Sequence, residues 1–179
     1  GSTDGSVETI RKYEPWISYW VSEPDQGQSD ALNKGFRRAH GEIVSWLNSD
    51  DSYEPQMLSV CVPELMGDSR RVLVYGDCHL VDESSVRLGT WRTGPCTTES
   101  LLMEGNQIPQ PSTLVRASAL SSIGGVEIQL RYVMDYVLWL RLSLVGEMIY
   151  VSGALVNFRH HTTSKSIADS HKFFEEKLA

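Results

Sequence analysis

The chain has 179 residues, of which 41% are hydrophobic and 22% charged, values that are ordinary for one globular domain with a sizeable core. Its net charge of −7, from 16 basic and 23 acidic residues, argues against nucleic-acid backbone binding as the main activity. The most hydrophobic window, 132–145, contains Asp135 and Arg141 and is shorter than the ~20 apolar residues that span a bilayer. The three cysteines are odd in number and widely spaced, and they lack the paired spacing of a zinc site. Because this pattern does not suggest a set of disulfides, we expect a reduced, cytoplasmic compartment.

The apolar pattern predicts strands and helices that alternate along the whole chain, which is typical of an α/β sheet flanked by helices. Strands are indicated at 17–21, 42–47, 72–75, 86–91, 113–115 and 148–158, and the 86–91 segment forms a hairpin with 80–81. Helices are indicated at 7–13, 29–39, after Pro55, at 98–104, 117–123 and 134–144, and near the C-terminus. Pro63 should break or kink the helix that follows Pro55.

Two adjacent carboxylates follow the strand predicted at 42–47, in the polar cluster Asn48-Ser49-Asp50-Asp51. Ligands bind beyond the carboxyl ends of strands in open α/β sheets, so this position suits a binding site. A Mg²⁺ or Mn²⁺ ion would relieve the repulsion between the carboxylates and keep coordination positions for phosphate oxygens. The alternative is a turn with helix-capping acids before Pro55, because Asp and Asn favour turns and N-caps for local reasons. This stretch alone leaves both interpretations open.

Three more positions have an ordinary and a functional interpretation. Asp77 follows the strand at 72–75 and is either a turn acid or a member of the site. Asp135 begins a largely apolar helix, where an acid either caps the helix or serves as a general base that the helix dipole keeps ionised. His160 and His161 follow the last strand and are either solvated loop residues or ligands.

Several short blocks of residues, in a fixed order, carry the strongest signal in the sequence. They include Gly1–Ser6, Ser22–Gly27 with 31–35 and 39–41, Trp46–Asp51, Tyr75–Asp77, Gln110–Ser112, Met134–Tyr136 with 138–141, and Phe158-Arg159 with His161 and Ser164. Each block is a weak signal by itself. In this order, over nearly the whole chain, they resemble the inverting nucleotide-sugar glycosyltransferases of family 2, which have the GT-A fold.

The resemblance implies a role for each matching residue. The implied nucleotide or donor-binding residues are Asp4, Asp25, Asn33 and Asp50, and the implied metal ligands are Asp51 and His161. The implied loop residues around the acceptor and donor sugar are Gln110, Pro111, Ser112, Trp139 and Arg159. Asp135 would be the general base that removes a proton from the acceptor hydroxyl, while Mn²⁺ or Mg²⁺ neutralises the diphosphate, in a single displacement with inversion.

The fold that the resemblance implies is a mostly parallel, mixed α/β sheet flanked by helices, with residues 1–179 in one GT-A domain. The family begins with a strand, a helix and a second strand before the turn that matches Gly1–Ser6, so we expect an N-terminally truncated fragment. The implied partners are a nucleoside-diphosphate sugar, with UDP favoured, and a glycan or lipid-linked acceptor. The expected location is the cytoplasm or its membrane face. The missing strand would leave open sheet edges, which predicts either a homo-oligomer or a poorly soluble chain.

The sequence departs from the family pattern at two positions, and two other functions are compatible with parts of it. Met134 and Val137 stand where many relatives have acids, so Asp135 is the one candidate base of its block. A nucleotidyltransferase would also pair carboxylates with a metal, but the sequence lacks its basic, glycine-rich phosphate loop. The other alternative is a non-catalytic remnant of the GT-A fold that binds a nucleotide or a protein partner without turnover.

Overall fold

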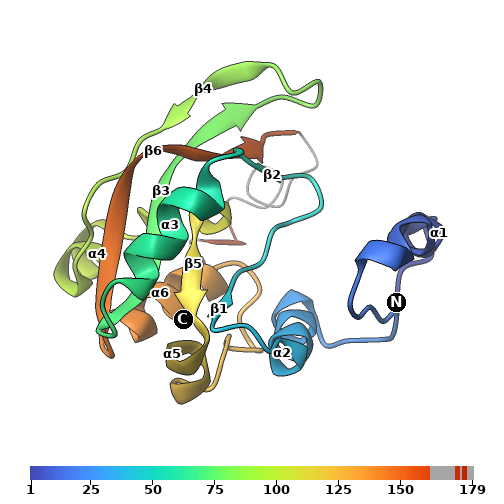
Figure 1. Cartoon of the computed structure of the whole chain (residues 1–179), viewed down its shortest axis with the longest axis horizontal. Helices are drawn as coiled ribbons and strands as arrows, with labels where there is room; N and C mark the ends of the chain where they lie inside the picture. Colours follow the sequence, from blue (N-terminus) through green and yellow to red (C-terminus); the bar gives the residue numbers. More distant parts are fainter. Residues whose placement is uncertain (162–171, 174, 177–179) are drawn as a thin grey trace.

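The computed structural model describes residues 1–161, 172–173 and 175–176, and within them a six-stranded mixed sheet packs against helices (Figure 1). The strands are β1 (Ile43–Val44), β2 (Ser52–Tyr53), β3 (Arg71–Val81), β4 (Arg87–Trp91), β5 (Leu114–Arg116) and β6 (Glu147–Arg159). The helices are α1 (Ser6–Tyr13), α2 (Gln28–Arg38), α3 (Met57–Met66), α4 (Thr98–Glu104), α5 (Ala117–Ser122) and α6 (Met134–Ser143). Two 3₁₀ turns cover Glu14–Trp16 and Gln110–Ser112.

The strand order is β1-β5-β3-β6-β2, with β4 paired to β3 outside this path. The mixed α/β architecture is as expected, but the expectation of a mostly parallel sheet is wrong. The β3–β6 pair is parallel, whereas the other four described pairs are antiparallel. A turn of a few residues between β3 and β4 permits only antiparallel pairing, while β3 and β6 are separated by the long crossover that a parallel pair needs.

β3 is the centre of the core, because it is buried against apolar side chains on both of its faces. Leu73 and Tyr75 pack in the cluster that includes residues of α4, α5 and α6, among them Trp139. Val74 points to the opposite face, into the cluster formed with Met57 and the rest of α3. Successive residues of a strand face opposite sides, so an almost continuous apolar run in β3 supplies both layers.

Gly76 lets β6 approach β3 at the point where the register between them shifts. Asp77 pairs with Ala154, whereas its neighbour Gly76 pairs with Val151, so β6 carries extra residues there. A Cβ atom at Gly76 would lie 2.8 Å from the Val151 carbonyl oxygen. Such a bulge bends the strand locally, and it lies next to the segment of β6 that leads to the candidate site.

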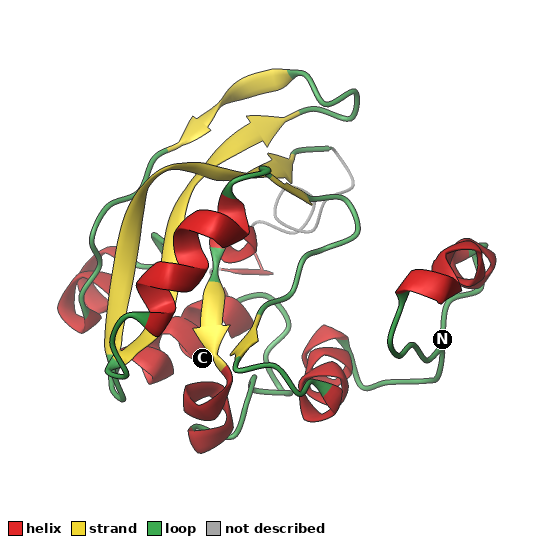
Figure 2. Cartoon of the chain, viewed as in Figure 1, coloured by secondary structure: helices red, strands yellow, loops and turns green. Residues whose placement is uncertain are grey.

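The amino-terminal part departs most from the predicted elements. The strand expected at 17–21 is absent, and of the strand expected at 42–47 only β1, Ile43–Val44, pairs, with β5. A strand exists through the hydrogen bonds of a neighbour, and the described residues offer none beside 17–21 and only β5 beside β1. α1 has no buried residue and lies apart from the rest of the chain, joined to α2 by an extended segment (Figure 2).

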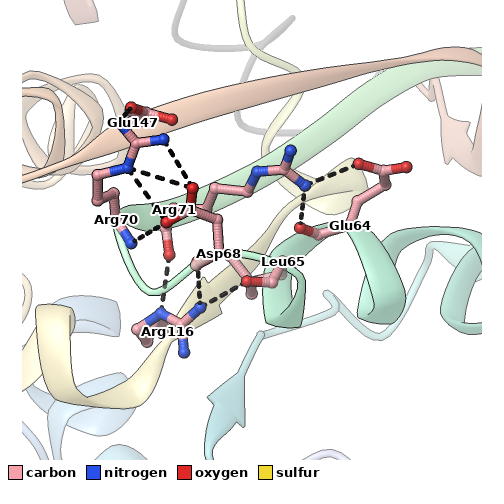
Figure 3. A network of polar contacts seen from close by, with 7 residues as sticks. All are labelled: Glu64, Leu65, Asp68, Arg70, Arg71, Arg116 and Glu147. Atoms are coloured by element: carbon pink, nitrogen blue, oxygen red, sulfur yellow. Dashed lines mark hydrogen bonds and ion pairs between the residues drawn. The ribbon is translucent and has the colours of Figure 1, made fainter.

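The end of α3 is held by a network of arginines (Figure 3). Pro63 lies inside α3, which continues to Met66, so of the two expected effects, a break or a kink, the break does not occur. The Arg116 guanidinium donates to the carbonyl oxygens of Leu65, Asp68 and Arg71. Orphan carbonyl groups at a helix C-terminus need such donors, and here β5 supplies them through Arg116.

Candidate functional site

A cavity of about 470 Å³ lies beside the turn that follows β1. Among the residues expected to form the site, Asp50, Gln110, Pro111 and Asp135 line it. Its remaining described walls come from Gln28, Asn48, Trp91, Asn106, Arg131, Tyr132, Met134, Phe158 and Phe173. Residues from distant parts of the sequence thus place two carboxylates and several aromatic rings around one space, which is the usual composition of a small-molecule site.

The Asn48 side chain organises the turn from which Asp50 and Asp51 project. Its amide nitrogen donates to Gln110 Oε1 at 3.2 Å and to Asp51 Oδ2 at 3.3 Å. Its amide oxygen accepts from Gln28 Nε2 at 3.3 Å, which ties the turn to the start of α2. Gln110 Nε2 in turn donates to the Trp46 carbonyl oxygen at 2.9 Å. The turn is therefore fixed by side chains from three segments, and both of its carboxylates have defined directions.

Asp50 and Asp51 have opposite surroundings. Asp51 is 9% exposed, and its Oδ1 accepts a hydrogen bond from the Arg159 backbone N–H at 2.9 Å. Burial raises the pKa of Asp51, and the charge of Asp50 adds to this, although the hydrogen bond from Arg159 opposes it. Asp50 is half-buried, lines the cavity, and its Oδ2 lies 3.1 Å from His161 Nε2. Of the two adjacent carboxylates, Asp50 is therefore the one that lines the cavity.

The described residues contain no group of three or more Asp, Glu, His or Cys side chains with the geometry of a metal centre. Asp50 offers a carboxylate oxygen at the cavity, and the His161 Nε2 atom lies 3.1 Å from that carboxylate. Both Asp51 oxygens accept hydrogen bonds, one from the Arg159 backbone and one from Asn48. The Asp50 carboxylate fits a hard cation such as Mg²⁺ or Mn²⁺ that takes most of its other ligands from phosphate oxygens and water.

Asp135 lies in the first turn of α6, as expected, and its side chain reaches the same cavity. Asn106 Nδ2 donates to Asp135 Oδ2 at 3.0 Å, and Asn106 Oδ1 accepts from the Ile108 backbone N–H at 3.2 Å. The bond to Ile108 fixes which end of the amide points toward the carboxylate. Asn106 could not be predicted as a site residue, because a single Asn after a helix-ending glycine is an ordinary loop residue until the fold brings it to α6.

Several residues with implied roles lie away from the cavity lining. Asp4 is exposed and accepts from Ser6, and Asp25 accepts from the Gly27 N–H at 2.9 Å at the start of α2. Asn33 makes two hydrogen bonds with the Val126 backbone, at 2.7 and 2.9 Å, beside a second cavity of about 290 Å³. Trp139 is fully buried and stacks on Trp46 at 5.8 Å.

Ser112 and Asp77 are buried polar residues with partners inside the fold. Ser112 donates to the carbonyl oxygen of Gly76 or Pro109, at 2.7 and 2.8 Å. Asp77, whose role the sequence left open, accepts from the Thr93 N–H at 2.9 Å and from the Tyr150 hydroxyl at 3.0 Å. These contacts hold the segment after β4 against β3, next to the cavity wall at Trp91. Of the C-terminal blocks, Ser164 lies outside the described residues.

Aromatic side chains form the wall that the sequence analysis did not assign to the site. Trp91, at the end of β4, lies 6.4 Å from Phe158 of β6, and Tyr132 lies 5.3 Å from Phe173, measured between ring centroids. All four rings line the cavity. The one indication of this wall in the sequence was Trp91 at the end of the predicted hairpin strand 86–91. Hairpin pairing alone does not show which face of the sheet the Trp91 side chain occupies.

Comparisons with known proteins agree with this fold. The sequence model of glycosyl transferase family 2 matches residues 1–105. An uncharacterized glycosyltransferase of Mycobacterium tuberculosis is 29% identical over 161 residues, which cover 88% of this chain and 60% of the relative. Chondroitin synthase of Escherichia coli is 24% identical over 170 residues, which cover 93% of this chain and 24% of the synthase. The chain thus spans at most about 60% of these two curated relatives.

Solved structures with the same fold have low sequence identity. S. aureus TarS in complex with UDP-GlcNAc superposes with a TM-score of 0.71 at 16% identity, over 97% of this chain and 52% of TarS. The mannosyltransferase PcManGT from Pyrobaculum calidifontis, in complex with GDP-Man and Mn²⁺, gives 0.67 at 15% identity, over 99% of this chain and 50% of that protein. The expected GT-A fold is confirmed. Within the described residues, no helix has the length and apolar character needed to cross a bilayer.

Proposed function

Because the chain belongs to glycosyl transferase family 2, we propose that it transfers a sugar from a nucleoside-diphosphate sugar to an acceptor hydroxyl, with inversion. The cavity that contains both Asp50 and Asp135 carries this proposal. Known relatives support it, since TarS binds UDP-GlcNAc and PcManGT binds GDP-Man. We keep UDP as the favoured donor base, and we treat residues 1–179 as one GT-A-like catalytic domain, a fragment of the full domain.

In the proposed mechanism, Asp135 is the general base. Its carboxylate takes the proton of the acceptor hydroxyl as that oxygen attacks the anomeric carbon of the donor, and the bond to the nucleoside diphosphate breaks on the opposite face. Asn106 holds Asp135 Oδ2 through a hydrogen bond of 3.0 Å, so the carboxylate has a fixed orientation toward the cavity. General-base catalysis depends on such positioning of the carboxylate relative to the reacting hydroxyl.

Asp50 and His161 would hold the divalent cation, Mn²⁺ or Mg²⁺, against the diphosphate. The resemblance assigned the metal contact to Asp51 and the ribose side to Asp50, whereas the geometry favours Asp50, because it lines the cavity and Asp51 does not. When bound, the cation would neutralise charge on the diphosphate leaving group. Asp51 would then orient the turn from behind, through its bonds to Arg159 and Asn48.

The aromatic wall supports a glycan as the acceptor, free or linked to a lipid. Trp91, Phe158 and Tyr132 offer flat apolar faces beside the proposed base. Sugar rings carry apolar C–H faces that pack against such rings, while their hydroxyls need polar partners like Asp135 and Gln110. We place the reaction in the cytoplasm or at its membrane face. All three cysteines are buried free thiols, which agrees with a reducing compartment.

Calorimetry with UDP and GDP, with and without Mn²⁺, tests the binding half of the proposal. We expect Mn²⁺-dependent binding of one nucleotide, lost in Asp50→Asn and kept in Asp135→Asn. A donor-hydrolysis and transfer assay tests the chemistry, and Asp135→Asn should lower turnover by ~10²-fold or more with little change in donor affinity. Binding without turnover in the parent chain would support the non-catalytic alternative, and no binding of either nucleotide would refute the proposal.

A further inference from the structure

Arg159, the last residue of β6, joins two turns that are more than thirty residues apart in sequence. Its backbone N–H donates to Asp51 Oδ1 at 2.9 Å, and its Nε donates to the Asp50 carbonyl oxygen at 2.9 Å. The other side of the guanidinium donates to the Asp82 carbonyl oxygen and, at 3.1 Å, to Ser85 Oγ. One planar group therefore contacts the Asp50–Asp51 turn and the β3–β4 hairpin turn at once.

The hairpin turn presents its two acceptors in a defined geometry. The Asp82 carboxylate accepts from the backbone N–H groups of Ser84 and Val86, at 2.9 and 2.8 Å. Ser85 has a φ of 64°, the one positive value among non-glycine residues of the described chain. Glycine or asparagine would adopt this conformation at lower cost, but glycine would leave the guanidinium without the hydroxyl acceptor.

The base of this connection is rigid. The His160 backbone N–H donates to the Val81 carbonyl oxygen at 2.8 Å, and Arg159 pairs with Val81 at the end of the β3–β6 ladder. A shift of the hairpin turn therefore cannot be absorbed by sliding of β6. The guanidinium connects such a shift to the Asp50 carbonyl group, and movement of the Asp50 backbone would displace the Cα atom that carries the carboxylate.

We propose that Arg159 is a positioning residue that couples the β3–β4 hairpin turn to the Asp50–Asp51 turn, and so sets the direction of the Asp50 carboxylate in the cavity. The identification of a nucleotide as the ligand that responds to this coupling rests on the proposed function. The coupling itself rests on the four hydrogen bonds of Arg159. Because coupling between sites is reciprocal, a nucleotide held at Asp50 also orders the hairpin turn.

Neighbouring serines of the hairpin turn provide a matched pair of variants. Ser85→Ala removes the hydroxyl acceptor, whereas Ser84→Ala changes an exposed serine of the same turn whose side chain does not contact Arg159. Ser85→Gly also removes the acceptor but relieves the positive φ, so it separates the hydrogen bond from backbone strain. Ser85→Asn keeps a side-chain acceptor in a residue that tolerates positive φ, and should rescue the parent behaviour.

Two readouts are measured on these variants. Hydrogen exchange of the peptide that covers 48–52 should become faster in Ser85→Ala and Ser85→Gly, and stay as in the parent chain in Ser84→Ala and Ser85→Asn. The affinity for UDP or GDP in the presence of Mn²⁺ should fall by ~5-fold or more in the first two variants and in neither of the others. The melting temperatures of all four should stay close together, because the turn is exposed.

The outcomes separate this inference from the proposed function. Unchanged exchange at 48–52 in both Ser85→Ala and Ser85→Gly overturns the coupling, whatever the nucleotide does. Faster exchange in these variants, with no nucleotide bound even by the parent chain, supports the coupling and refutes the proposed function. Faster exchange with unchanged nucleotide affinity overturns the claim that Arg159 positions Asp50 for binding.

Discussion

Asp50 and Asp51 are adjacent in the sequence but have different chemical roles. Asp51 is buried and spends both oxygens on hydrogen bonds within the protein, so its charge organises the turn. Asp50 keeps an oxygen beside His161 at the cavity, where a cation or phosphate group can reach it. A pair of adjacent acids in a loop points its side chains in different directions, so the two positions cannot share one environment.

Asp51→Asn should destabilise the fold, whereas Asp50→Asn should not. An amide at position 51 directs an N–H group at either the Arg159 backbone N–H or the Asn48 amide, so one buried donor loses its acceptor. We expect a loss of ~1–3 kcal/mol in the free energy of unfolding, measured by urea denaturation. Asp50→Asn is the control, with a change within ~0.5 kcal/mol. Equal stability of the two variants would contradict this division of roles.

The stability contribution of Asp51 should depend on pH with a defined sign. Burial raises its pKa in the folded chain above the ordinary value of 3.8, so the folded state binds a proton more readily than the unfolded state. The resulting stabilisation is complete below pH 3.8 and is lost as the pH rises through the folded-state pKa. Urea denaturation of the parent and Asp51→Asn from pH 4 upward should show the parent's advantage shrinking as the pH increases. A growing advantage would show that the pKa is lowered instead.

Candidate residues at the ends of predicted elements reach the cavity more often than candidates whose surroundings depend on distant partners. Asp50, Gln110 and Asp135 project from the ends of predicted elements, and the fold brings all three to the cavity. Asn33 lies on a predicted helix face but bonds to the backbone of Val126, and Trp139 stacks in the core. Helical spacing tells which residues share a face, and only the packing tells whether that face meets a ligand or a neighbouring element.

At the scale of elements, Arg116 determines how β5 and the end of α3 are joined. Its guanidinium donates to three backbone carbonyl groups, a set that no single short side chain can satisfy (Figure 3). Arg116→Ala should lower the free energy of unfolding by ~1–3 kcal/mol, because these carbonyl groups lose a charged donor. Arg116→Lys should recover only part of this loss, since an ammonium group lacks the planar fork of donors.

Arg70 provides the control within the same network. Its side chain is 71% exposed and pairs with Asp68 and Glu147, and exposed ion pairs contribute little to stability because solvent screens them. Chemical denaturation should therefore show a larger loss in the free energy of unfolding for Arg116→Ala than for Arg70→Ala. An effect of Arg70→Ala as large as that of Arg116→Ala would mean that charge pairing, rather than satisfaction of carbonyl groups, stabilises this end of the sheet.

Elements with their own local signals were predictable, and elements that depend on a neighbour were not. The helix at Thr98–Glu104 matches its prediction because Thr97 forms a capping box with Ser100 and Gly105 ends the helix. The alternating apolar residues at 17–21 form no strand, since backbone pairing needs a partner that the sequence pattern does not specify. The sequence predicted a mostly parallel sheet but no particular strand pairs, and β3–β6 is the one parallel pair of the described sheet. Pairing across a short connection such as that between β3 and β4 has to be antiparallel.

At the scale of the whole molecule, the amino-terminal segment and β1 form an open side. α1 buries none of its residues, and Tyr13, Trp16 and Tyr19 are 59%, 78% and 51% exposed. β1 ends the sheet, with β5 beside it on one edge. Exposed aromatic groups and an unpaired strand edge both favour contact with another chain, because each leaves apolar area or backbone groups without a protein partner.

We therefore expect this chain to self-associate as its concentration rises, through the segment that carries Trp16 and Tyr19. Light scattering coupled to size-exclusion chromatography should show a mass that increases with concentration, and Trp16→Ser with Tyr19→Ser should lower it at unchanged melting temperature. Val86→Ser with Leu88→Ser is the matched control, since these side chains of the β4 hairpin are 58% and 61% exposed on another part of the surface. A mass that stays monomeric at every concentration would contradict the prediction. If only the control variant, Val86→Ser with Leu88→Ser, lowered the mass, the contact between chains would lie at the β4 hairpin. Association is driven by the burial of apolar surface, so the variant that removes the contact surface is the one that weakens it.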